Sequence, residues 1–356
     1  MMISGSDVAW ERTQPKVSNT MEISLKGTWV RVPTLEVEDK SIVVTGRIVR
    51  RAVVHDEEWL QSDLKDPENC IRQLKQQRSD ALYADIFTFS QKLPITTPRF
   101  SYHLEWDSVA AIRLISFKDW WEKLPQETRK NVRRAQKRGV VVRVTPFDDQ
   151  LVKGIVEVNN DTPVRQNVRF AHYGKTFEQV KKDHSAFVDR SDFICAYVGD
   201  ELTGFLKIVY RGDIASILQL LPKSSHSDKR PANALVARAV ELCEAKGISH
   251  LTYGMFNYGN KGDSPLREFK VRNGFEEILV PRYYVPLTKW GKTCMKLNLH
   301  RGLHGILPHR VITIGVNLRA RLYDLQRRTG RCSSMPEQPN SIRQTECSNP
   351  PAGSNT

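Results

Sequence analysis

The stretch from Ile214 to Gly247 constrains the fold more than any other part of the chain. It begins with an apolar run of strand length, IASILQLL, continues through the polar loop PKSSHSDKRPA, and ends in NALVARAVELCEAKG. The last segment has apolar residues near helical spacing and stops at a glycine, which commonly ends helices. A cationic loop that leads from a strand into a helix N-terminus offers free backbone N–H groups to an anion. The stretch therefore predicts an anion site, with an ordinary strand-to-helix turn as the alternative.

The order of elements around this stretch predicts two α/β units. From Val140 the pattern predicts a strand, two helices, a three-stranded meander, a helix, a strand, a helix and a last strand. The second of these helices is predicted to run from Thr176 to Asp189. The predicted segments are a disordered N-terminus at 1–21, an N-terminal α/β subdomain at 22–116, a basic connecting helix at 117–139, the second unit at 140–287, a basic amphipathic helical extension at 288–331 and a disordered tail at 332–356.

Two segments account for the net charge of +14. Residues 117–138 hold eight basic side chains against three acidic ones, and residues 288–331 hold ten against one. In the first segment Arg129, Arg133 and Lys137 recur at helical spacing and share one helix face. Local positive charge of this kind favours a phosphate-rich partner, namely a nucleotide cofactor, tRNA or an anionic membrane surface. The alternative is a solvated helix face.

The second basic segment has an amphipathic pattern of its own. Val311, Ile314, Leu318, Leu322 and Leu325 are spaced by three and four residues, and arginines accompany them. A basic amphipathic helix either docks on the core of its own protein or lies on an anionic membrane surface. The sequence leaves both outcomes open.

Several classes of protein and partner are not expected. No run approaches 18 apolar residues, and the N-terminus lacks the apolar core of a secretion signal. The six cysteines are scattered without CxxC pairs, which favours a reducing cytoplasm and predicts no metal site. The basic segments lack interleaved stacking aromatics, and no helix-turn-helix or zinc motif is evident, so DNA is not an expected partner. We expect a cytoplasmic protein that can be peripheral at the inner face of a membrane.

The loop NNDTPVRQNVRFAHYGK, between the first two helices of the second unit, is dense in hydrogen-bonding and aromatic side chains. Long polar loops in compact domains are usually functional or disordered, and the aromatics favour a functional loop. Arg165, Gln166, His172 and Tyr173 are therefore candidate ligand-binding residues. The alternative for His172 is a surface or packing histidine.

Three segments carry a family resemblance: LPQETRKNVRRAQKRGVVVRV, TPVRQNVRFAHYGK, and YGMFNYGN followed by LREFKVRNGF. With the element order, they resemble GNAT-superfamily acyltransferases, in particular the FemABX-like transferases and their relatives in bacterial envelope polysaccharide synthesis. The resemblance covers about Phe117 to Leu287 and is weak over the first 115 residues. It implies an α/β fold with a mixed sheet flanked by helices, in a tandem arrangement with a partial first and a complete second GNAT-like unit.

The resemblance also implies an acyl-CoA co-substrate, with acetyl-CoA as the first candidate, and no metal. The usual CoA loop of these enzymes reads Gln/Arg-x-x-Gly-x-Gly/Ala, and the matching positions here run from Lys229 to Ala234. Lys229, Arg230, Asn233 and Ala234 are therefore predicted to bind the donor's phosphates. Ala232 replaces the first glycine, which normally lets the backbone approach the pyrophosphate closely.

The resemblance assigns roles to further residues. Simple GNAT enzymes often have a tyrosine four residues before a Gly-Phe pair, and here that position is Lys270, whose ammonium can stabilise a developing oxyanion. The predicted catalytic residues are Lys270, His172 as a base, and Tyr258. The predicted acceptor-binding residues are Arg165, Gln166, Tyr173, Asn260 and Asp263, with plain turn chemistry as the alternative for Asp263.

The leading hypothesis is an acyltransferase in which an amine or hydroxyl attacks an activated carbonyl directly. The acceptor would be a small-molecule or lipid-linked sugar or peptide precursor of the cell envelope. The first alternative replaces acyl-CoA with aminoacyl-tRNA, whose phosphates would contact Arg129, Arg133 and Lys137. The second alternative is a non-catalytic GNAT-like binding module in an envelope-synthesis complex.

Overall fold

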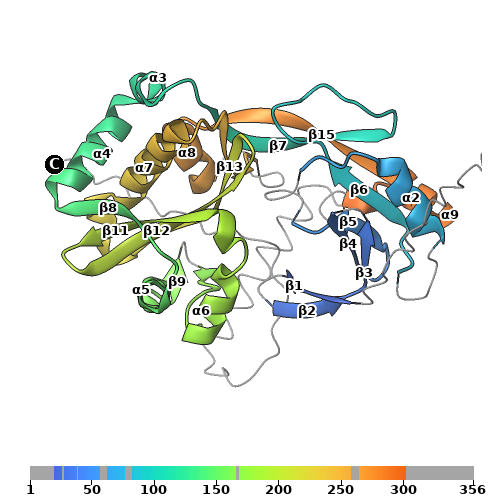
Figure 1. Cartoon of the computed structure of the whole chain (residues 1–356), viewed down its shortest axis with the longest axis horizontal. Helices are drawn as coiled ribbons and strands as arrows, with labels where there is room; N and C mark the ends of the chain where they lie inside the picture. The colour runs from blue at the N-terminus through green and yellow to red at the C-terminus, as the bar shows by residue number, and fades with distance from the viewer. Residues whose placement is uncertain are drawn as a thin grey trace, which may run out of the picture.

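The computed structural model describes residues 20–25, 28–37, 39–56, 62–76, 82–165, 168–257 and 264–301 of the 356-residue chain. Eleven strands form one mixed sheet in the order β3-β4-β5-β6-β15-β7-β14-β13-β12-β11-β8 (Figure 1). The strands of the sheet are β3 (Thr34–Val37), β4 (Lys40–Thr45), β5 (Arg51–Val54), β6 (Ile86–Ser90), β7 (His103–Arg113), β8 (Val140–Thr145), β11 (Ser191–Val198), β12 (Glu201–Arg211), β13 (Ile214–Pro222), β14 (His250–Met255) and β15 (Glu276–Pro286). Two hairpins stand outside it, β1 (Met21–Leu25) with β2 (Thr28–Val32), and β9 (Val164–Arg165) with β10 (Val168–Arg169).

Eight α-helices are described, some of them flanked by single 3-10 turns. The α-helices are α2 (Pro67–Gln76), α3 (Phe117–Lys123), α4 (Gln126–Lys137), α5 (Asp149–Asn160), α6 (Phe177–His184), α7 (Pro231–Ala245), α8 (Pro265–Arg272) and α9 (Lys289–Lys296), and the 3-10 turns are η1 (Val188–Arg190), η2 (Ser224–Lys229) and η3 (Leu299–Arg301). In the part of the chain that the structure describes, no helix has the length and apolar character needed to cross a membrane.

The sheet contains the same motif twice. Strands β3, β4 and β5 form an antiparallel meander, after which α2 leads to β6, parallel to β5. Strands β11, β12 and β13 form a second meander, after which α7 leads to β14, parallel to β13. A parallel pair needs a crossover connection, and a helix supplies it in both halves. We call β3–β6 with α2 the first half, and β8 and β11–β14 with their helices the second half.

The strand that follows each motif pairs with the opposite half. β7 follows β6 in the chain but lies beside β14, and β15 follows β14 but lies beside β6. β7 and β15 pair with each other, antiparallel, in the centre. The strand order therefore reads nearly the same from both ends, with β8 as the addition to the second half. The predicted α/β fold, a mixed sheet flanked by helices in a tandem arrangement, is confirmed.

Helices cover both faces of the second half (Figure 1). Trp120 of α3, Ala135 of α4, Leu235 of α7 and Phe269 of α8 belong to one buried cluster with one face of the sheet. The other face packs on α5 and α6 through a separate cluster that includes Val152. The helix α7 agrees with its sequence pattern, because its apolar residues at helical spacing are buried and it ends before a glycine with positive φ.

The helix predicted from Thr176 to Asp189 is shorter than expected. Thr176 caps the helix, but α6 ends at His184, and Asp189 lies in a separate 3-10 turn. The Lys207 amine on β12 donates to the carbonyl oxygens of His184 and Ala186, at 2.8 and 2.6 Å. These contacts satisfy carbonyl groups at the helix end that would otherwise be buried without partners. Burial lowers the pKa of Lys207 to about 8.

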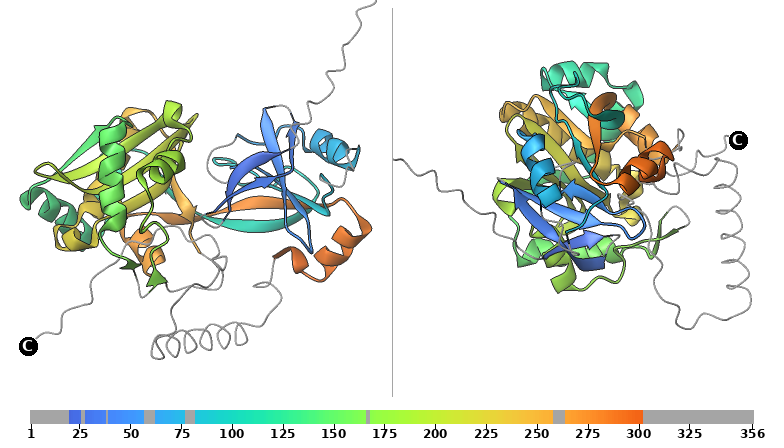
Figure 2. Two further views of the ribbon diagram at one scale, coloured as in Figure 1. Left: turned by 90° about the horizontal axis from the view of Figure 1, so that it is seen from below. Right: turned by 90° about the vertical axis from the view of Figure 1, so that its right-hand side faces the viewer.

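The short helix α9 is fixed against the first half (Figure 2). A Cβ built on Gly291 would lie 2.0 Å from the Asp85 carbonyl oxygen. The Trp290 indole N–H donates to the Ile48 carbonyl oxygen at 3.1 Å, and Cys294 is fully buried. The helical pattern from Val311 to Leu325 lies outside the described residues.

The contact at Gly291 predicts that Gly291→Ala destabilises the protein. The added methyl overlaps main-chain atoms of Asp85, which cannot rotate away, so we expect a loss of about 1–3 kcal/mol in the free energy of unfolding. Urea denaturation measures the change. Thr293→Ala on the exposed side of the same helix is the control and should stay close to wild type. Equal stability of the two variants would contradict the packing described here.

Candidate functional site

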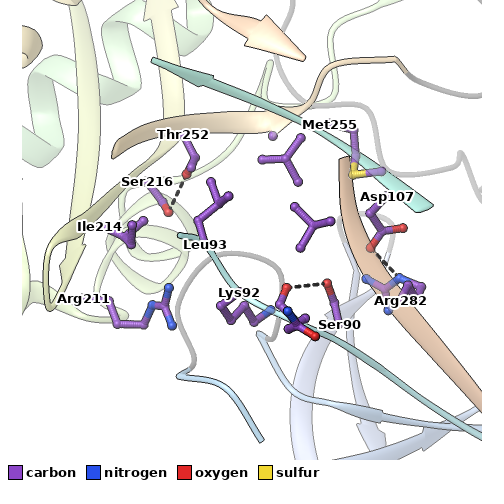
Figure 3. Close-up of a pocket in the computed structure, with 14 residues that line it drawn as sticks. Ser90, Lys92, Leu93, Asp107, Arg211, Ile214, Ser216, Thr252, Met255 and Arg282 are labelled. Atoms are coloured by element: carbon purple, nitrogen blue, oxygen red, sulfur yellow. Dashed lines mark hydrogen bonds and ion pairs between the residues drawn. The ribbon is translucent and has the colours of Figure 1, made fainter. Parts of the chain in front are cut away.

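A pocket lies where the two halves meet (Figure 3). Its cavity volume is about 50 Å³, and the pocket is open to solvent on one side. The loop after β6 contributes Lys92, the central strands contribute Asp107 and Arg282, and the second half contributes Arg211 and Ser216. A cavity of this size has room for a small reacting group, and its opening lets the rest of a larger molecule extend into solvent.

The strands β13 and β14 separate at one wall of this pocket. They pair only from Ile214 opposite His250 to Ser216 opposite Thr252. Just beyond, a register shift leaves Leu218 of β13 without a partner on β12, and the pairing of β14 with β7 is irregular between Thr252 and Met255. Bulges of this kind bend a strand and occur frequently beside active sites. The local sequence thus opens the sheet at this level.

Two hydroxyl groups mark the point of separation. The Ser216 and Thr252 hydroxyl oxygens lie 2.8 Å apart, and the Thr252 hydroxyl also lies 3.2 Å from the Ala215 carbonyl oxygen. Because Thr252 has a single hydroxyl hydrogen, which it donates to Ala215, the Ser216 hydroxyl is the donor in the pair. Both hydroxyl oxygens keep lone pairs for a further donor, such as an attacking amine.

Cationic groups dominate the pocket. Asp107 accepts a hydrogen bond from the Arg282 guanidinium at 2.6 Å, and both side chains are largely buried. Lys92 is buried nearby. Arg211 lines the pocket without a hydrogen bond or ion pair among the described residues, and burial lowers its pKa from the usual value. Among the described residues that line the pocket, three cations stand against one carboxylate, which favours a ligand that carries negative charge.

Lys270 lies on the other side of β14 from these groups. It is fully buried, its amine donates to the Met255 carbonyl oxygen at 2.7 Å, and it sits 4.7 Å from the centre of the Tyr253 ring. Met255 itself lines the pocket. Lys270 thus holds the irregular end of β14 in place. Its predicted role in stabilising developing charge stays a prediction.

The predicted acceptor loop lies near the far end of β13. Arg165 is buried, donates to the Pro222 carbonyl oxygen at 2.9 Å and stacks on the Phe170 ring, which His172 also contacts. Burial, and then Lys175, lower the pKa of His172 to about 4. Tyr173 is exposed.

Arg165 and His172 of the predicted loop thus lie on the same phenylalanine ring, but neither lines the central pocket. Gln166, Tyr258, Asn260 and Asp263 lie outside the described residues. The roles predicted for all of these residues stay predictions.

The predicted donor loop surrounds an uncapped helix N-terminus. Arg230 precedes α7 in a left-handed conformation, no side chain caps the helix, and Pro231 occupies its first turn. Burial, and then Arg134, lower the pKa of Arg230, and Arg138 adds to the effect. Arg134 and Arg138 thus lie close enough to Arg230 to affect it, although Arg138 is paired with Asp228 at 2.6 Å, and all three are near the start of α7, whose free N–H groups favour an anion.

The remaining loop residues have intramolecular contacts. The Lys229 amine lies 2.9 Å from a ring nitrogen of His226, and the Asn233 amide donates to Asn273 at 3.0 Å. Ala234 packs against the core at partial exposure. The side chain of Ala232 belongs to the same buried cluster, so its methyl group points inward. The alanine at this position therefore leaves the N–H groups open to an anion.

The basic helix α4 continues this surface. Arg133 and Lys137 are exposed, Arg129 is half-buried, and Arg133 lies 5.7 Å from the Trp121 ring. α4 packs against α7, so the exposed cations of α4 adjoin the helix N-terminus. The structure thus brings the predicted anion face and the predicted donor loop together.

A group of potential metal ligands occurs elsewhere. His103, Glu105 and His300 place their ligand atoms within 4.8 Å of one another. One Glu105 oxygen already accepts from His300 at 2.7 Å and from Arg301 at 2.9 Å. Burial alone would raise the pKa of Glu105, but these two hydrogen bonds lower it below the usual value. A guanidinium on the carboxylate opposes a divalent cation, so the group fits an ion-paired anchor better than a metal site.

Sequence reasoning missed the pocket residues. Asp107 and Arg282 meet although they are 175 positions apart in the chain, and Lys92 and Arg211 come from opposite halves. No short motif contains them. One signal in the sequence could have found them. Arg282 is a charged residue inside an otherwise apolar strand, and a strand interior tolerates such a charge only with a partner or a ligand.

Comparison with solved structures agrees with the fold. A C-terminal domain assigned to a lysylphosphatidylglycerol synthetase from Agrobacterium fabrum superposes with a TM-score of 0.50 at 14% identity, covering 80% of this chain and 89% of that one. FemX superposes with a TM-score of 0.51 at 9% identity, covering 75% of this chain and 89% of its own. No family model and no curated protein sequence matches. At these identities the likeness shows a GNAT-like fold.

The buried His184 predicts a pH-dependent stability. Burial, and then Lys207, lower its pKa from 6.5 to about 3. Between these values the unfolded chain binds a proton that the folded chain does not, so the free energy of unfolding falls as the pH falls. The expected slope is up to about 1.4 kcal/mol per pH unit below pH 6. His184→Leu should remove this part of the slope in urea titrations from pH 7 to 4. An unchanged slope would contradict the prediction.

Proposed function

We propose that this chain is a transferase that moves an acyl or aminoacyl group from a phosphate-bearing donor to an acceptor in the central pocket. One spatial relation supports the proposal: the N-terminus of α7, which we propose as the anion site, and the pocket lie at the two ends of the same strand. β13 begins beside the pocket at Ile214 and Ser216 and ends at Pro222, from which η2 leads to α7.

The length of β13 sets the size of the donor. Six residue steps separate Ser216 from Pro222, which is about 20 Å of extended strand. A donor with phosphates at α7 therefore needs a long, narrow arm to present its carbonyl carbon in the pocket. The pantetheine arm of CoA and the single-stranded end of a tRNA both have this form, whereas a short acyl phosphate does not.

The pocket supplies groups suited to direct attack. An amine or hydroxyl of the acceptor adds to the donor carbonyl, the carbonyl oxygen becomes an oxyanion, and the thiol or ribose oxygen leaves. Asp107 is the only carboxylate among the described lining residues and is therefore our candidate for the group that accepts the acceptor's proton. Arg211 and Lys92 are placed to bind an anionic part of the acceptor, such as a phosphate.

Our first choice of donor is an acyl-CoA, with acetyl-CoA as the probe. The three arginines around an uncapped α7 suit a pyrophosphate, and the inward methyl of Ala232 leaves the backbone accessible. The acceptor we propose is a small-molecule or lipid-linked sugar or peptide precursor, because the open mouth of the pocket accommodates more than the reacting group.

A second donor, aminoacyl-tRNA, is favoured by the extent of the cationic surface. A pyrophosphate needs only the groups around Arg230, yet Lys130, Arg133 and Lys137 continue the positive charge along exposed positions of α4. A nucleic acid backbone would use them. The two solved structures compared above add to this context: one is named for a lysylphosphatidylglycerol synthetase, and another is FemX.

Ligand binding separates the two donors. Acetyl-CoA should raise the melting temperature, and Arg230→Gln should weaken its binding about 10- to 100-fold, because a hydrogen bond to a charged group contributes about 1.5–3 kcal/mol. Arg133→Gln is the matched control and should leave acetyl-CoA binding unchanged. If charged tRNA is the donor, both variants weaken tRNA binding and its affinity falls steeply with salt. Neither ligand raising the melting temperature would contradict the proposal.

The pocket itself is tested by Asp107→Asn. An amide oxygen still accepts from Arg282, but an amide cannot take up the acceptor's proton, so we expect transfer to slow by about 10²- to 10⁴-fold. Donor binding should stay near wild type, whereas the melting temperature should fall, because the buried Arg282 loses its opposite charge. Transfer is therefore compared at a temperature where both proteins are folded. Asp213→Asn, at an exposed turn outside the pocket, is the control. Wild-type transfer by Asp107→Asn would place the reaction elsewhere.

A further inference from the structure

Helix α9 and the loop beside it expose large apolar side chains next to lysines. Trp290 and Leu297 are 44% and 57% exposed, and they lie seven residues apart, on one side of the helix. Ile48 lies in the adjacent loop and is 80% exposed. Its carbonyl oxygen accepts a hydrogen bond from the Trp290 indole. We call Ile48, Trp290 and Leu297, with Lys289, Lys292 and Lys296, the α9 surface.

The charge on this surface has one sign. Lys289, Lys292 and Lys296 are all exposed and recur at helical spacing along α9. No aspartate or glutamate occurs from 288 to 301. Like charges at this spacing repel each other, so the segment gains from an anionic partner. The sequence that follows continues the same composition, with Asp324 as the only acid up to residue 331.

The opposite side of α9 is fixed, so the exposed side keeps one orientation. Gly291 packs on the Asp85 main chain, and Cys294 is buried. After the helix, His300 and Arg301 both donate to Glu105 of β7. The residues that lie against the protein are thus distinct from those of the α9 surface, and a partner can contact that surface without displacing the helix.

We propose that the α9 surface docks on a membrane that contains anionic lipids. An indole and two aliphatic side chains suit the interfacial layer of a bilayer, and the lysines suit the anionic headgroups around them. The helix α4 provides the contrast: it exposes basic side chains, but none of its residues is an exposed large apolar one. Charge alone suits a nucleic acid, whereas charge beside exposed apolar side chains suits a membrane surface.

The two basic helices lie at opposite ends of the molecule (Figures 1 and 2). Their substitutions can therefore be compared without mutual interference. The inference does not depend on the proposed transferase, because membrane binding can be measured without a donor or an acceptor.

Vesicle sedimentation with the full chain tests the inference. The wild type should bind phosphatidylcholine vesicles that contain phosphatidylglycerol and not vesicles of phosphatidylcholine alone, with affinity that falls as salt rises. We expect the triple variant Lys289→Gln, Lys292→Gln and Lys296→Gln to bind these vesicles roughly 10- to 100-fold more weakly. Each lysine near an anionic membrane surface strengthens binding by up to about tenfold. The matched control changes three exposed basic residues of α4, Lys130, Arg133 and Lys137, to glutamine.

Each outcome decides the inference. Loss of binding in the α9 variant, with the control near wild type and both melting temperatures unchanged, supports it. Equal loss in both variants would mean that net charge alone drives binding and would overturn it. A third variant of the full chain changes Arg319, Arg321 and Arg327 to glutamine. Loss of vesicle binding in this variant alone would also overturn the inference. Binding of tRNA in place of vesicles by the α9 surface would also overturn it.

Fluorescence gives a second, residue-level readout. Brominated lipids in phosphatidylglycerol vesicles should quench part of the tryptophan emission of the wild type, and Trp290→Phe should lose that quenched part while retaining most of the vesicle affinity. Trp106→Phe, at a tryptophan that is also exposed but lies outside the α9 surface, is the control. Quenching that remains in Trp290→Phe would show that a different surface meets the bilayer.

Discussion

The antiparallel pairing of β7 with β15 is the constraint on which the rest of the structure depends. The register runs from Glu276 opposite Ala111 to Tyr284 opposite His103. Because each of these strands continues the chain of one half and pairs with the other, neither half completes its sheet alone. Separating the halves would expose two long strand edges, which is costly in water. The halves are therefore held at one distance, and the pocket between them is preformed.

This junction also explains why a buried ion pair is kept there. Burying Asp107 and Arg282 costs desolvation that their attraction only partly offsets, and an apolar pair of similar volume is often as stable. Charges at the centre of the sheet are thus better accounted for by what the pocket binds than by stability. The same reasoning applies to Arg211, which is half-buried and has no ion-pair partner among the described residues.

The sequence predicted what depends on neighbouring residues. The predicted end of the helix at Gly247 agrees with α7, whose last residue, Ala245, shortly precedes that glycine, because helix ends depend on residues within three or four positions. Contacts between residues far apart in the chain depend on no such local rule, so the sequence did not predict them. The end of α6 depends on Lys207, 23 residues away, and the ion pair of the pocket spans 175. The roles of the candidate loop residues therefore stay predictions, while the central pocket was missed.

The two proposals constrain each other through β7. Asp107 lines the pocket and Glu105 anchors the segment after α9, and two residues of strand correspond to about 7 Å. The segment after α9 is therefore anchored close to the pocket, while the proposed anion site at α7 lies at the other end of β13. Docking through the α9 surface would favour an acceptor whose reacting group projects from a lipid over one that diffuses freely, because docking concentrates the protein where such an acceptor lies.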